Sequence, residues 1–226
     1  MALRDDLAEV SEPILRKILD HPYWTGQRDG TLPGDVLAHF VLQDALHLLP
    51  QFARAAARTA AVAGSDEHVE LLSKAALGTI GARDGMVHGF GMLAAALGIP
   101  SELAEARPES NPTTTAYTSF LHASSAASFA EGVAALMPCA WFHLTVADDL
   151  AERHKPGSRY AFWISAYHPG DEYRNDVLDR LLLMVDEIGE HASPAERDRI
   201  LHRFGIGARY EWEFADAAWN KLDWTP

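Results

Sequence analysis

Residues 33–63 read PGDVLAHFVLQDALHLLPQFARAAARTAAVA, a stretch rich in alanine and leucine. Pro33 stands at its start, where proline suits a first helical turn, because its φ is already helical and its missing amide would have no partner there. Gly64 and Ser65 follow the stretch and favour a helix end. The stretch therefore predicts one long helix from Pro33 to about Ala63.

Apolar residues keep helical spacing on both sides of this stretch, and His21-Pro22 breaks the first helix because the residue before proline avoids the α region. No run of alternating β-branched residues is long enough to predict a strand. Long helices joined by short loops predict one all-α domain over residues 1–226, a packed helical bundle. The other predicted helices are 3–19, 66–97, 115–127, 131–153, 159–167, 171–191 and 194–220, with loops at 26–31 and 108–112.

Three local features refine the prediction. Pro138 falls inside the helix 131–153 and should kink it, because its ring removes a donor and clashes with the preceding turn. Ser193 and Glu196 have the spacing of a capping box, which predicts a helix start. Gly205 and Gly207 are expected to bend or interrupt the last helix.

Composition and charge exclude several classes of protein. The chain has 226 residues, 48% of them hydrophobic, and 19 basic against 32 acidic residues give a net charge of −13. Phosphate backbones and anionic lipid surfaces repel such a chain, so we expect neither a nucleic-acid nor a membrane partner. The single cysteine, Cys139, excludes an internal disulfide and any cage built of cysteines alone. No segment of about 18 uninterrupted apolar residues occurs, and we expect a soluble, cytoplasmic protein.

Cys139 follows Pro138 in an apolar helical segment, and His143 lies four residues further on, hence on the same face. The distortion at the proline can turn the sulfur toward a cavity, and an imidazole near a thiol can stabilise the reactive thiolate. The alternative is a small buried hydrophobe beside a histidine that is satisfied in the core.

Two carboxylates also interrupt apolar stretches. Asp44 lies mid-helix among apolar neighbours and is a candidate for a functional site; the alternatives are a solvent-facing turn or a pair with His47 on the same helix. Glu211 and Glu213 are two residues apart, so we expect one to face inward, where aromatic neighbours would raise its pKa as a general acid requires. The alternative is that both are solvated. The aromatic residues Tyr117, Trp163 and Tyr167 either line a pocket or fill the core.

Carboxylate–histidine pairs raise the possibility of a metal site. Asp44 with His47 and Asp84 with His88 each share a helical face, and Glu131 and His143 would complete a two-metal set. The spacings do not match the paired Glu-x-x-His motifs of such bundles, so we expect no metal.

Seven segments, in order along nearly the whole chain, together resemble the TenA/thiaminase II family of aminopyrimidine hydrolases. They are Pro13-Ile-Leu with His21-Pro22-Tyr23, Asp29-Gly30-Thr31-Leu32-Pro33, Phe40 with Gln43-Asp44, Pro112 to Tyr117-Thr118, Met137-Pro138-Cys139-Ala-Trp141, Trp163-Ile164-Ser-Ala-Tyr167 and Tyr210-Glu211-Trp-Glu-Phe214.

The resemblance implies an all-helical fold of the haem-oxygenase-like type, assembly as a homotetramer, and a hydrolysis in thiamin salvage without metal or cofactor. In the family a cysteine adds to the pyrimidine ring, a glutamate protonates a ring nitrogen, and an aspartate holds the ring's amino group. Water then replaces the departing amine or thiazole. By motif match these roles would fall on Cys139, Glu211 and Asp44, while Tyr167 would bond the glutamate or the substrate and Tyr117 would be a further pocket residue.

The chain departs from the family pattern at four places. His47 replaces a Tyr or Phe, His143 replaces a Tyr, Asp84 replaces a Glu, and Phe214-Ala215 replaces Phe-Trp. We expect His47, His143 and Phe214 to contact the substrate. The departures from the family pattern leave the identity of that substrate open. The alternatives are a metal-dependent or quinone-synthase-like oxygenase and a pyrimidine-binding protein with altered catalysis. The charge argues against the direct DNA contact that the label of transcriptional activator, carried by the family, would require.

Overall fold

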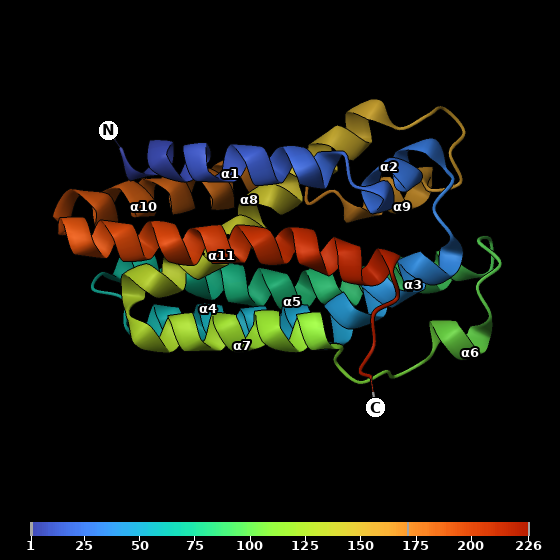
Figure 1. Ribbon diagram of the computed structural model, residues 1–226, viewed down its shortest axis with the longest axis horizontal. Helices are drawn as coiled ribbons and strands as arrows, with labels where there is room; N and C mark the ends of the chain where they lie inside the picture. The colour runs from blue at the N-terminus through green and yellow to red at the C-terminus, as the bar shows by residue number, and fades with distance from the viewer. Residues whose placement is uncertain (1, 171, 226) are drawn as a thin grey trace.

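The computed structural model describes residues 2–170 and 172–225, and in this part of the chain the regular secondary structure is all helical (Figure 1). This confirms the predicted all-α class. The α-helices are α1 (Leu3–Leu19), α2 (Pro22–Asp29), α3 (Gly34–Gln43), α4 (Leu49–Ala61), α5 (Asp66–Ala94), α6 (Ser101–Ala104), α7 (Pro112–Ala127), α8 (Phe129–Arg153), α9 (Ala161–Tyr167), α10 (Asp179–His191) and α11 (Pro194–Trp219), with π-helical turns η1 (Asp44–Leu48) and η2 (Arg174–Leu178).

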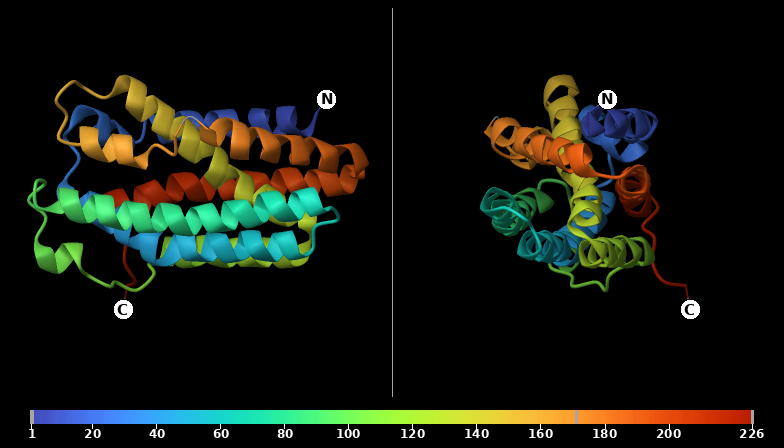
Figure 2. Two further views of the ribbon diagram at one scale, coloured as in Figure 1. Left: turned by 180° about the vertical axis from the view of Figure 1, so that it is seen from behind. Right: turned by 90° about the vertical axis from the view of Figure 1, so that its left-hand side faces the viewer.

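Helix α8 is the centre of the bundle. It packs against α1, α2, α4, α7, α9, α10 and α11, and in the end-on view of Figure 2 it runs between the other helices. By length and composition α8 could cross a membrane, but 61% of its apolar window is buried inside the protein. Its apolar character is therefore that of a core helix, buried on nearly every side.

Helices α8 and α11 approach each other closely at Pro138. A Cβ atom on Gly207 would lie 3.0 Å from Cγ of Pro138 and 3.2 Å from the carbonyl oxygen of Ala135, which is closer than an ordinary packing contact. The predicted interruption of the last helix is wrong, because α11 is continuous through both glycines. The predicted capping box is confirmed: the Ser193 side chain accepts from the Glu196 amide, and Glu196 accepts from the Ser193 amide.

The stretch 33–63 is helical, as predicted, but it is not one regular helix. Its middle forms η1, in which the amide of Leu49 donates to the carbonyl of Asp44, five residues back. Pro50 follows at the start of α4; it has no amide to donate, and its ring would clash with the carbonyl of a regular preceding turn. The wider π turn avoids that clash, and such turns are frequent at functional sites.

The loop predicted at 26–31 is largely wrong, because α2 occupies most of it. The ring of His21 accepts a hydrogen bond from the Tyr23 amide at 3.1 Å, which caps the helix that Pro22 begins. Gly30, with φ of 76°, ends it in the left-handed conformation that favours glycine. The proline that ends α1 thus also begins α2.

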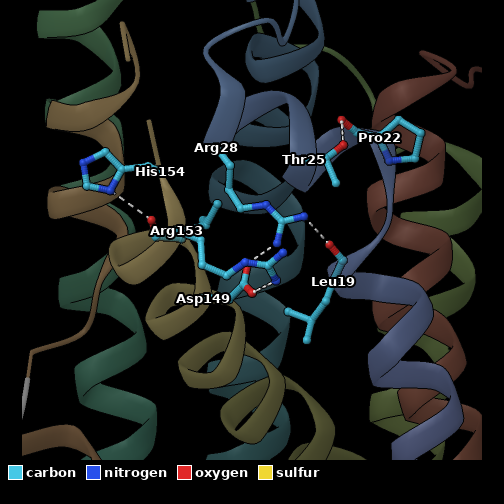
Figure 3. A network of polar contacts seen from close by, with 8 residues as sticks. Leu19, Pro22, Thr25, Arg28, Asp149, Arg153 and His154 are labelled. Atoms are coloured by element: carbon cyan, nitrogen blue, oxygen red, sulfur yellow. Dashed lines mark hydrogen bonds and ion pairs between the residues drawn. The ribbon is translucent and has the colours of Figure 1, made fainter. Parts of the chain in front are cut away.

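A buried ion pair ties α2 to the end of α8 (Figure 3). Arg28 pairs with Asp149 and also donates to the carbonyl of Leu19 at 2.9 Å, while Arg153 pairs with the other oxygen of Asp149 at 2.7 Å. Removing Asp149 would leave the buried charge of Arg28 without its ion-pair partner. The network therefore ties α2 and the end of α1 to the end of α8.

Candidate active site

The fold brings together three residues that the sequence places far apart. Asp44 begins η1, Cys139 follows Pro138 in α8, and Glu211 lies in α11. The Cys139 thiol lies within hydrogen-bonding reach of the Glu211 carboxyl, and the charges of Glu211 and Asp44 both act on Cys139. The hydroxyl of Tyr117, on α7, donates a hydrogen bond to Oε1 of Glu211. Glu213, two residues on, is exposed. Of the pair, Glu211 is therefore the inward carboxylate.

Burial dominates the electrostatics of this group. It raises the pKa of Asp44 to about 8, with the charge of Glu211 as a second cause. It raises the pKa of Glu211 to about 7, against the hydrogen bonds from Tyr117 and Cys139. Burial, then the two carboxylates, raise the pKa of the Cys139 thiol. The thiol is therefore protonated at neutral pH, and the carboxyl that can accept its proton lies beside it.

A cavity of about 460 Å³ opens onto Asp44 and Cys139. Its volume lies in the range of small-molecule pockets. The wall consists mainly of side chains from α4, α5 and α8, and it also contains aromatic groups from α9. The polar and aromatic residues of the wall include Asp44, Cys139, His143, Trp163, Tyr167 and Tyr173.

Aromatic rings give the cavity a planar wall. Tyr167, at the end of α9, stacks on Trp163 with ring centroids 6.1 Å apart and planes inclined by 27°. It also lies against the ring of His143, at 4.6 Å between centroids. Flat faces of this kind suit the stacking of a planar heterocycle and exclude water from it.

His143 gives the sulfur no positive charge. Burial lowers the pKa of His143 to about 4, the charge of His168 lowers it further, and the contact of His143 with the Tyr167 backbone opposes both. The imidazole is therefore neutral near pH 7. The partner within reach of the Cys139 thiol is Glu211.

Comparison with known proteins identifies the family of the chain. The model of the TENA/THI-4/PQQC family matches residues 9–221. The chain belongs to this family. It is 32% identical to the aminopyrimidine aminohydrolase of Bacillus subtilis over 206 residues, which cover 91% of this chain and 84% of that protein.

Solved structures of TenA homologues have the same fold. A TenA homologue from P. horikoshii superposes with a TM-score of 0.78 at 27% identity, covering 97% of this chain and 99% of that one. A domain from Shewanella denitrificans with a heme oxygenase-like fold superposes with a TM-score of 0.68 at 13% identity, covering 98% and 93%. The predicted family and the predicted haem-oxygenase-like fold are confirmed.

Three residues expected at the substrate of this TenA-family protein lie outside the cavity wall. Nε2 of His47 is 2.9 Å from the carbonyl oxygen of Pro108, so His47 does not pair with Asp44. Phe214 is buried edge-to-face against Phe40, with ring centroids 5.0 Å apart. Tyr117 is fully buried and reaches the site through Glu211. Of the expected substrate contacts, the cavity wall contains Tyr167 and His143.

The residues that suggested a metal site are scattered. Asp84 is exposed and pairs with Arg83, and His88 is exposed. Glu131 pairs with Arg199 and Arg203. Within residues 2–170 and 172–225 no group of three or more His, Cys, Asp or Glu side chains could hold a metal ion. The geometry therefore does not favour the oxygenase alternative.

Sequence reasoning missed Tyr173, which lies in the cavity wall six residues after Tyr167. Its neighbours in sequence are polar and give no apolar periodicity that would place it inside. The signal that could have found it is an aromatic residue in an otherwise polar segment just before a helix.

Proposed function

We propose that this protein is a hydrolase of the thiamin-salvage type, which releases hydroxymethylpyrimidine from an aminomethylpyrimidine or from thiamin, with Cys139 as the nucleophile. The observation that carries the proposal is the approach of the Cys139 thiol to the Glu211 carboxyl, with Cys139 and Asp44 at the wall of a cavity of about 460 Å³. The curated relative from Bacillus subtilis, named as an aminopyrimidine aminohydrolase, supports it.

The first step is addition of the thiol across a carbon–nitrogen bond of the ring. The sulfur of Cys139 bonds to the ring carbon beside the one that carries the exocyclic methylene. Glu211, ionised, takes the thiol proton and delivers it to the adjacent ring nitrogen, so the adduct is neutral. Asp44 accepts hydrogen bonds from the ring's amino group and fixes the ring in the plane that the attack needs.

The second step is exchange of the substituent. The lone pair of the protonated ring nitrogen expels the leaving group, which takes the electron pair of the broken bond. Water adds to the exocyclic carbon and loses a proton. The sulfur then departs, and its proton returns from the ring nitrogen through Glu211. The products are the hydroxymethylpyrimidine, the free amine or thiazole, and the enzyme in its starting state.

Two further residues prepare this chemistry. The hydrogen bond from Tyr117 favours the ionised form of Glu211 and so lowers the pKa of that carboxyl, against the larger effect of burial. The elevated pKa that remains suits a group that must both accept and return a proton near neutral pH. Tyr167 offers its ring as a stacking surface for the pyrimidine.

The test is product formation by purified protein. Wild type should convert 4-amino-5-aminomethyl-2-methylpyrimidine or thiamin to the hydroxymethyl product, and Cys139→Ala should lose this activity by a factor of at least about 1,000, because the covalent route is gone. Binding of the hydroxymethyl product to Cys139→Ala, measured by calorimetry, shows that the pocket is intact. A variant as active as wild type would refute the mechanism.

The same proposal includes assembly as a homotetramer. Helix α5 exposes Leu77, Val87 and Met92, whose exposed fractions are 75%, 45% and 62%. Apolar side chains on one exposed helix suit a subunit interface. Light scattering should give the tetramer mass for wild type and a smaller one for Leu77→Asp; a monomeric wild type contradicts this part. We place the enzyme in the cytoplasm, where reducing conditions keep a catalytic thiol free.

A further inference from the structure

Tyr173 is a cavity residue that the mechanism above does not use. It directly precedes η2 and packs against the hydrophobic core. It lines the same cavity as Cys139 and His143, and its ring centroid lies 6.3 Å from that of His143. Tyr173 therefore lies near His143, one helical turn from Cys139, in the cavity wall.

The backbone around Tyr173 is held in place from α8. Oδ1 of Asp148 lies 3.0 Å from Nε2 of His168, and Oδ2 of the same carboxylate accepts from Arg174 at 2.9 Å. The amide of Tyr173 donates to the carbonyl of Gly170 at 3.2 Å. One α8 carboxylate therefore ties residues on both sides of Tyr173 to the helix that carries Cys139.

Tyr173 and Cys139 line the same cavity. Burial raises the pKa of Tyr173, and so does the charge of Cys139. The Tyr173 hydroxyl thus stays protonated and offers a neutral oxygen to a molecule in the cavity.

The substrate geometry of the proposed function directs the leaving group toward the sulfur. The exocyclic carbon is attached to the ring carbon beside the one that Cys139 attacks, so the leaving group departs next to the sulfur. His143, one helical turn from Cys139, is neutral, and its ring contacts the Tyr167 backbone. Tyr173 supplies a hydroxyl to this region of the cavity.

We propose that the Tyr173 hydroxyl oxygen accepts a hydrogen bond from the ammonium group that departs from the exocyclic carbon, and so selects aminomethyl substrates over those with a thiazolium leaving group. This inference rests on the proposed function. When the carbon–nitrogen bond breaks, its electron pair stays on nitrogen, and the ammonium, which already carries three protons, leaves as ammonia. Tyr173 transfers no proton; it positions the leaving group.

The test compares two substrates in Tyr173→Phe, which keeps the ring and removes the hydroxyl. For 4-amino-5-aminomethyl-2-methylpyrimidine, kcat/KM should fall about tenfold, the effect of one hydrogen bond to a charged group. For thiamin, whose leaving nitrogen has no N–H, kcat/KM should change less than about twofold. The ratio of the two values is the readout, because damage to the fold lowers both together.

The matched control is Tyr160→Phe. The Tyr160 hydroxyl is also buried, but it donates to the carbonyl of Leu32 at 2.7 Å and lies outside the cavity wall. Loss of the Tyr160 hydroxyl should leave the ratio of the two kcat/KM values unchanged. Tyr173→Leu should change the ratio in the same direction as Tyr173→Phe. It replaces Tyr173→Phe as the test if that variant does not fold. An unchanged ratio in both Tyr173 variants overturns this inference alone, whereas a wild type inactive on both substrates overturns the proposed function and the inference with it.

Discussion

The thiol of Cys139 lies within hydrogen-bonding reach of the carboxyl of Glu211, although 72 positions separate the two residues in the chain. Their helices, α8 and α11, meet where Gly207 packs on Pro138. Gly207 lies one helical turn before Glu211, and Pro138 directly precedes Cys139. The close approach of the two helices therefore sets the distance between the nucleophile and its proton acceptor.

Gly207→Ala should separate the two helices. The new Cβ would lie 3.0 Å from Cγ of Pro138, a ring that cannot rotate away. We expect a loss of about 1–3 kcal/mol in the free energy of unfolding, measured by urea titration, and a lower kcat. Gly205→Ala is the control, because its nearest neighbour would be Cγ1 of Val10 at 3.5 Å, an ordinary contact. Equal behaviour of the two variants would contradict the packing argument.

Glu211→Gln should lower kcat by a factor of about 100 to 10,000, because the amide cannot take the thiol proton or return it. Glu213→Gln, on the same helix but exposed, should leave kcat unchanged. Steady-state rates of product formation for both variants give the comparison. A drop in the Glu213 variant that equals that of Glu211→Gln would assign the effect to helix α11 as a whole.

Tyr117→Phe should shift the pH profile rather than abolish activity. The Tyr117 hydroxyl donates to Glu211 and stabilises its ionised form, which lowers the pKa of that carboxyl. Without this bond the pKa of Glu211 rises, so the acidic limb of kcat/KM against pH should move to higher pH. A shift of the acidic limb to lower pH would show that the bond stabilises the protonated form of Glu211 instead.

The sequence predicted most helices and, through the resemblance, the three residues that converge. Those features depend on apolar spacing and on side-chain chemistry, which a single chain shows directly. The π turn at Asp44 was not predictable, because it reflects Pro50 acting on the turn before it. The orientation of His47 toward the Pro108 carbonyl and the position of Tyr173 depend on segments that only tertiary packing brings together.

Asp44→Asn should make the protein more stable at alkaline pH. Burial raises the pKa of Asp44 to about 8, above that of an unfolded aspartate. Between about pH 4 and about pH 8 the folded state therefore binds more protons than the unfolded state, and stability falls as pH rises through this range. Asparagine carries no charge at any pH, so the free energy of unfolding of the variant should exceed that of wild type by about 1 kcal/mol or more at pH 8.5, and this difference should vanish toward pH 4.

Urea unfolding at both pH values measures this difference, with Asp84→Asn as the exposed control. A wild-type protein whose stability rises from pH 6 to pH 8.5 would show that Asp44 is not held in its protonated form.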